Sequence, residues 1–237
     1  EKEYLLRDHI PFIVEGRQIY LPFLAVYLQE RGDGERQGTE VMLPSAQLLL
    51  LSYIYQGCGE LLTSEASCQL SLTPTSISRA SRQLEDMGLI RTEKRGVQKV
   101  IFSEKTPENL FRDAKKFLCN PVKRKIYVPK VKIKQKLPIS GYSALAEYSM
   151  LNPPVVESFA TDSVAMWDSV ASKKLYDSDD QCAVELWRYD PNRLAEGGAV
   201  DRLSLALALR DERDERIEEA IEEMLAGVWK DIHGKRD

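Results

Sequence analysis

The feature that most constrains this chain is a short amphipathic segment with a helix start at one end and a helix stop at the other. Apolar residues recur at intervals of three and four within residues 74–87, which is the spacing of one helical face. Thr73 is suited to cap such a helix with its hydroxyl, and Pro74 to occupy its first turn. Gly88 follows as a stop. The sequence therefore predicts a helix here with one buried and one polar face.

The segments on either side give this helix a context. Residues 43–57 are dense in Leu and Tyr and predict a buried helix, and residues 63–70 predict a second, shorter helix before a turn at 71–73. Residues 89–94 and 97–102 predict two strands of a hairpin around an Arg-Gly pair. Helix, helix, turn, helix and hairpin in this order are typical of a winged helix-turn-helix.

The rest of the chain reads as a mixture of strands and helices. At the N-terminal end, residues 12–14 and 17–20 predict a hairpin, residues 21–31 a helix and residues 32–40 a flexible loop. After the central segment we expect helices at 107–118, 142–151, 201–210 and 212–230, strands at 124–128, 155–160 and 182–189, and a basic loop or strand at 129–138.

These elements predict an α+β fold with a winged helix-turn-helix in the middle, an N-terminal hairpin-helix extension and a mixed α/β C-terminal domain. The expected boundaries are 1–40 for the N-terminal extension, 41–106 for the winged helix, 107–139 for a basic connector and 140–237 for the C-terminal domain. The acidic, amphipathic helix over 212–230 is expected to pack on its own domain, with dimerisation as the alternative.

Positive charge is concentrated in one part of an acidic chain. Residues 91–139 carry 15 basic and 4 acidic side chains, although the net charge of the whole chain is −4. Phosphate contacts need concentrated positive charge, so this block favours a nucleic-acid partner. A solvated basic surface is the alternative reading of the same block.

The polar face of the helix over 74–87 carries small hydroxyls and two arginines. Small hydroxyls allow close approach to a duplex, and Arg79 and Arg82 can contact guanine bidentately or pair with phosphate. Arg95, at the hairpin tip, is expected to enter a minor groove. An ordinary amphipathic helix beside solubilising edge lysines would show the same pattern. The predicted DNA-binding residues are Thr73, Thr75, Ser76, Ser78, Arg79, Arg82, Lys94, Arg95 and Lys99.

Two runs of residues resemble a known family. Residues 70–80 (LSLTPTSISRA) resemble the helix-turn-helix of MarR-type bacterial regulators, and residues 84–91 (LEDMGLIR) resemble that family's junction between helix and wing. The resemblance covers residues 44–103, about a quarter of the chain. The chain is longer than is usual for the family, and the family's dimer-forming terminal helices are not evident. The resemblance implies a sequence-specific transcription regulator, expected to be a homodimer, that contacts double-stranded DNA through Thr75, Ser76, Ser78, Arg79, Arg82 and Arg95.

Shorter stretches resemble other proteins. Residues 141–145 and 151–154 are similar to the region that follows the DNA-binding domain in bacterial abortive-infection antitoxins. That resemblance implies a repressor of its own operon that opposes a nucleotidyltransferase toxin, with a protein partner at the C-terminal domain. Residues 200–205 and 214–216 resemble the end of a group of bacterial winged-helix regulators. A plasmid or phage replication initiator is a further alternative, although no second winged helix is visible.

Several other classes of protein are disfavoured. No apolar run is long enough for a membrane span, and the first residues lack a signal-peptide pattern. The four cysteines form no CxxC pair and only two histidines are present, so we expect neither a metal nor another cofactor. No phosphate-binding loop or nucleophile pattern occurs, and the acidic run at 177–180 is expected to be a solvated loop. We therefore expect no catalytic residues and no enzyme activity, and the scattered thiols favour a cytoplasmic location.

Overall fold

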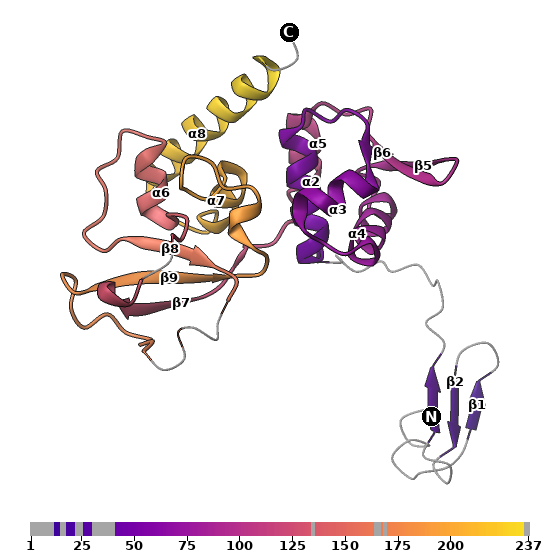
Figure 1. The fold of residues 1–237 in the computed structure, drawn as a ribbon, viewed down its shortest axis with the longest axis horizontal. Helices are drawn as coiled ribbons and strands as arrows, with labels where there is room; N and C mark the ends of the chain where they lie inside the picture. Colours follow the sequence, from indigo (N-terminus) through magenta and orange to yellow (C-terminus); the bar gives the residue numbers. More distant parts are fainter. Residues whose placement is uncertain are drawn as a thin grey trace. The chain divides into compact units, whose positions relative to one another are not determined.

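The computed structural model has an α+β fold, and the chain divides into two units at residue 40 (Figure 1). No helix in the described part of the chain is long and apolar enough to cross a membrane. The described residues are 12–14, 18–21, 26–29, 41–133, 136–163, 167 and 170–234.

The N-terminal unit holds a three-stranded antiparallel sheet. Its strands are β1 (Phe12–Val14), β2 (Gln18–Leu21) and β3 (Val26–Gln29), hydrogen-bonded in chain order. Residue 13 lies opposite residue 19 in the β1–β2 pair, which confirms the predicted hairpin.

The helix predicted over residues 21–31 is wrong, because β3 occupies part of that range and pairs with β2 along its full length. β-branched and aromatic residues such as Val26 and Tyr27 favour a strand when a partner is present. Helical spacing in the sequence does not report that partner. The loop predicted at 32–40 lies outside the described residues.

The second unit begins with the helices and hairpin that the sequence predicts. A short strand, β4, was not predicted, and it pairs with β6 to give a sheet in the order β4-β6-β5. The hairpin turn lies one residue later than expected, because it falls at Gly96 and Val97 and not at Arg95 and Gly96. The elements are α2 (Pro44–Tyr55), β4 (Leu61–Leu62), α3 (Thr63–Leu70), α4 (Pro74–Asp86), β5 (Arg91–Arg95) and β6 (Gln98–Phe102).

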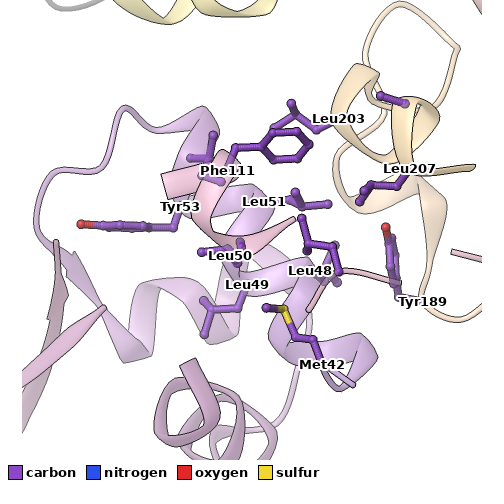
Figure 2. Packing of buried hydrophobic residues seen from close by; sticks show 14 of the residues in the cluster. Met42, Leu48, Leu49, Leu50, Leu51, Tyr53, Phe111, Tyr189, Leu203 and Leu207 are labelled. Atoms are coloured by element: carbon purple, nitrogen blue, oxygen red, sulfur yellow. The ribbon is translucent and has the colours of Figure 1, made fainter. Parts of the chain in front are cut away.

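Helix α2 is buried on all sides. Nine consecutive residues, 46–54, are buried, as expected for a helix at the centre of a fold. Helices α4 and α5 (Pro107–Ala114) pack against it. Figure 2 shows Leu48 and Leu51 directed towards Tyr189 and Leu207, which belong to the C-terminal half of the unit. The C-terminal half therefore completes the core around α2.

A second sheet lies in the C-terminal half. Its strands are β7 (Val122–Pro129), β8 (Ser158–Thr161) and β9 (Gln181–Trp187), in the order β7-β9-β8. The central strand, β9, pairs antiparallel with β7 and parallel with β8. Residues 107–139, interpreted from the sequence as a basic connector, thus contribute α5 and a strand of this sheet. The proposed domain boundaries stay a prediction.

Helices complete this half of the unit on one side of the sheet (Figure 1). Helix α8 buries Ala220, Met224, Val228 and Ile232 and packs against α7 and α5. These side chains therefore pack within the chain, as expected from the prediction that this helix packs on its own domain. The elements are α6 (Gly141–Glu147), α7 (Arg202–Ala208) and α8 (Glu215–Gly234), with single 3-10 turns η2 (Lys130–Lys132) and η3 (Pro191–Arg193).

A buried polar cluster joins α2 to α7. The Tyr55 hydroxyl donates to Asp201 Oδ1 at 3.1 Å and accepts the backbone N–H of Leu203 at 2.9 Å. Asp201 Oδ1 also accepts the backbone N–H of Ser204 at 2.9 Å and so caps α7. Burial raises the pKa of the Asp201 carboxyl above its ordinary value, because a charged carboxylate is poorly solvated there.

This cluster predicts a component of the pH dependence of stability. Because the pKa of Asp201 is raised in the folded protein, the folded state binds more protons than the unfolded chain as the pH rises above the ordinary value of 3.8. The free energy of unfolding therefore falls as the pH rises from there through the raised pKa. Asp201→Asn keeps an oxygen to cap α7 and is expected to remove this fall. Urea unfolding from about pH 4 to about pH 7 measures it.

The exposed Asp211 supplies a matched control, since Asp211→Asn removes the same charge without a buried partner. A pH profile for Asp201→Asn that is as steep as that of Asp211→Asn would contradict the assignment.

Candidate nucleic-acid interface

Helix α4 is anchored by local chemistry at its start and by packing along one face. Thr73 Oγ1 accepts the backbone N–H of Ser76 at 3.1 Å, and Pro74 occupies the first turn. Ile77, Ala80 and Leu84 are buried, and α4 packs against α2. The predicted cap and the predicted buried stripe are both confirmed.

Two further side chains tie α4 to its neighbours. Gln83 Oε1 accepts the backbone N–H of Leu43 at 2.9 Å, just before α2 begins. Glu85 Oε1 accepts both the backbone N–H and the hydroxyl of Thr92, at 2.9 and 2.8 Å, on β5. Gly88, with φ of 68°, then reverses the chain. The position of α4 is thus set from the α2 side and from the hairpin side.

The outer face of α4 presents small polar side chains and two cations. Thr75 and Ser78 are exposed, as are Arg79 and Arg82. Across the described ranges, no carboxylate lies within ion-pair distance of either guanidinium. Both guanidiniums are therefore available to an outside acceptor.

Two of the predicted DNA-binding residues stabilise the first turn of α4. Thr73 and Ser76 bond to one another through their hydroxyls, with 2.9 Å between the oxygens. Ser76 is half-buried, while Thr73 is exposed at the helix start. Their hydroxyls are occupied in capping α4, which fixes the first turn.

The hairpin brings two predicted lysines together. Lys94 and Lys99 are directly opposite partners in the β5–β6 pair. Opposed residues in an antiparallel pair share one face, and residues two positions apart along a strand also share it. The lysines therefore lie on the face of Thr92, which is bonded to α4. Val97, at the turn, is fully exposed, and the sequence reasoning did not single it out.

Arg95 has a different environment from the one expected of a free cation at a hairpin tip. Its guanidinium donates to both carboxylate oxygens of Glu60, at 2.7 and 2.8 Å, and pairs with Glu93 at 3.0 Å. The guanidinium lowers the pKa of the Glu60 carboxyl. Glu60 lies 35 residues earlier in the chain, so no local pattern pointed to it. Arg95 links the hairpin to the segment before β4.

Basic residues after the hairpin gather around one depression. A cavity of about 590 Å³ lies beside the end of α4 and is lined by Lys105, Arg112, Lys115 and Lys116. Asp113 pairs with Lys105 at 2.8 Å, which leaves the depression with an excess of positive charge. The concentration of positive charge in residues 91–139 predicted a basic surface, and the fold brings these four cations together around the depression.

Among the described residues, no group of three or more His, Cys, Asp or Glu side chains is placed so that it could hold a metal ion. Comparisons with protein-family models, curated proteins and solved structures found no match for this chain. The interpretation of the site therefore depends on its own residues and geometry.

Proposed function

We propose that residues 41–106 form a winged helix-turn-helix and that the protein is a sequence-specific regulator of transcription that binds double-stranded DNA. One observation carries the proposal. Arg79 and Arg82 stand exposed, without a carboxylate partner among the described residues, on a helix held from two sides. The nearby Arg91 and Arg95, by contrast, are held by carboxylates.

The residues divide between reading bases and holding phosphates. Guanidinium groups suit bidentate contact with guanine, so we assign base reading to Arg79 and Arg82, with Thr75 and Ser78 beside them. Lys94 and Lys99 suit phosphate contacts, which position a protein without reading sequence. The depression lined by four cations adds a second phosphate-binding surface. Arg95 would reach a minor groove only by leaving Glu60.

The salt dependence of binding tests this function. Phosphate contacts release counterions, so affinity for a mixed-sequence duplex should fall steeply as salt rises from about 50 to about 200 mM. Fluorescence anisotropy with a labelled duplex measures it. An affinity that does not change with salt would contradict phosphate binding.

The pairing of Arg95 with Glu60 makes a separate prediction. Glu60→Gln removes a negative charge beside the hairpin and releases Arg95 from its closest partner. We expect DNA affinity to rise about 5-fold, and the salt dependence to steepen by about one phosphate contact. Glu219→Gln is the matched control, because it makes the same change of net charge at an exposed position on α8. Equal effects of the two variants would show that overall charge, and not Arg95, is responsible.

A protein partner at the C-terminal half is the second candidate function. It is favoured by Met150 and Val155, which are 96% and 76% exposed on either side of a Pro-Pro pair. Apolar side chains so exposed are typical of interaction surfaces when they cluster. A homodimer is also part of the proposal, and sedimentation equilibrium of the purified chain tests it. Ala220, Met224, Val228 and Ile232 of α8 are already buried within the chain, so these side chains are not available to a dimer interface.

A further inference from the structure

A second cavity lies where the turn before α4 meets the C-terminal half. It has a volume of about 440 Å³, within the range of small-molecule sites. One wall is formed by the start of α2 and by Ser71 and Leu72, in the turn between α3 and α4. The other wall follows the end of β9 and η3. Pro44 and Leu72, both half-buried, give the cavity an accessible apolar part.

A hydrogen bond from Arg193 joins the two walls. Arg193 Nη1 donates to Ser71 Oγ at 2.7 Å, across 122 positions of sequence. Arg193 Nε also pairs with Asp190 Oδ2 at 2.8 Å, and Asp190 caps η3. Ser71 has a left-handed backbone, with φ of 49°, at the end of α3. This contact places a C-terminal cation directly on the turn that precedes α4.

The side chains that line the cavity carry charges of both signs. Arg193 and Asp190 form an ion pair with each other. Arg188 donates through Nε to the Asn120 carbonyl at 3.1 Å, but no acceptor in the described ranges is bonded to its terminal nitrogens. Asp162 likewise has no cation within ion-pair distance among those residues. The cavity thus offers one guanidinium donor, one carboxylate acceptor and an apolar surface.

We propose that this cavity binds a free α-amino acid with an apolar side chain. The ligand's carboxylate would meet Arg188, its ammonium group would meet Asp162, and its side chain would cover Pro44 and Leu72. A simple anion would meet Asp162 and a simple cation would meet Arg188, so a zwitterion fits the lining better than either. This part rests on the proposed function of α4. A ligand that contacts both walls would change the affinity for DNA, because Ser71 lies in the turn that positions α4.

Thermal melting of the full chain without DNA tests the binding. Each standard L-amino acid is added separately at about 10 mM, enough to occupy a site with a millimolar Kd. We expect at least one apolar amino acid to raise the Tm. Calorimetric titration should then show binding at least about 10-fold weaker for the matching carboxylic acid without the ammonium group and for the matching amine.

Variants make the assignment specific. Arg188→Ala and Asp162→Asn should each weaken binding at least about 10-fold, while Arg213→Ala, at another exposed position, leaves it unchanged. The proposal is overturned if no amino acid raises the Tm, or if Arg188→Ala binds as tightly as the parent. Because DNA is absent from these measurements, either result leaves the proposed DNA binding to be judged separately.

Discussion

Arg79→Ala is expected to weaken binding to the preferred DNA site by about 1–3 kcal/mol and to relax the preference for one base pair. The physical reason is that Arg79 is exposed on α4 and has no carboxylate partner among the described residues, so its guanidinium is free to contact a base edge. Competition binding with single-base variants of the site measures both effects.

Two further variants separate base reading from charge. Arg79→Lys keeps the positive charge but loses the planar fork, so it should restore phosphate attraction without restoring base preference. Arg213→Ala removes an exposed cation elsewhere and should change affinity little. Equal weakening of Arg79→Ala on every DNA sequence would contradict a role in base reading.

The second large effect is expected in the core of the second unit. Leu50 is fully buried in α2, in the middle of the nine buried residues. Leu50→Ala should lower the free energy of unfolding by about 2–5 kcal/mol, because it leaves a cavity in addition to losing buried apolar surface. Urea unfolding followed by circular dichroism measures the change.

The control for this substitution is Leu175→Ala, which makes the same change at a side chain that is 40% exposed. Its expected cost is within about 0.5 kcal/mol. A similar small cost for Leu50→Ala would show that α2 does not form the centre of the core.

Local signals explain why the central segment could be predicted from sequence. Helix α4 has its cap, its first-turn proline, its apolar stripe and its terminal glycine within 16 consecutive positions, 73–88. Helix α3 also matches its predicted bounds, and Ser71, the first residue of the predicted turn, is its C-cap. Where all determinants of an element are adjacent in sequence, the pattern is sufficient.

Contacts between distant residues explain what the sequence did not predict. β4 is two residues long and depends on β6, which follows only after α3, α4 and β5. The pairing of β3 with β2 is local in sequence, and there the helical spacing of apolar residues was misleading. The pairing of Arg95 with Glu60 spans 35 positions. Arg95 was therefore predicted as a free cation, whereas the structure shows it bonded to Glu60. The cavity between Ser71 and Arg193 arises only when the C-terminal half packs against the turn. No periodicity or motif in a single sequence reports such encounters.

The most direct test of the proposed function is selection of binding sites from a random pool of double-stranded DNA by the full chain, at two salt concentrations. The account predicts enrichment of a defined sequence at both concentrations, with weaker overall retention at the higher one. If the protein is a dimer, the enriched sequence should contain two related half-sites separated by about one helical turn. Failure to retain any DNA at low salt would contradict the proposal that α4 and the hairpin form a DNA-binding surface.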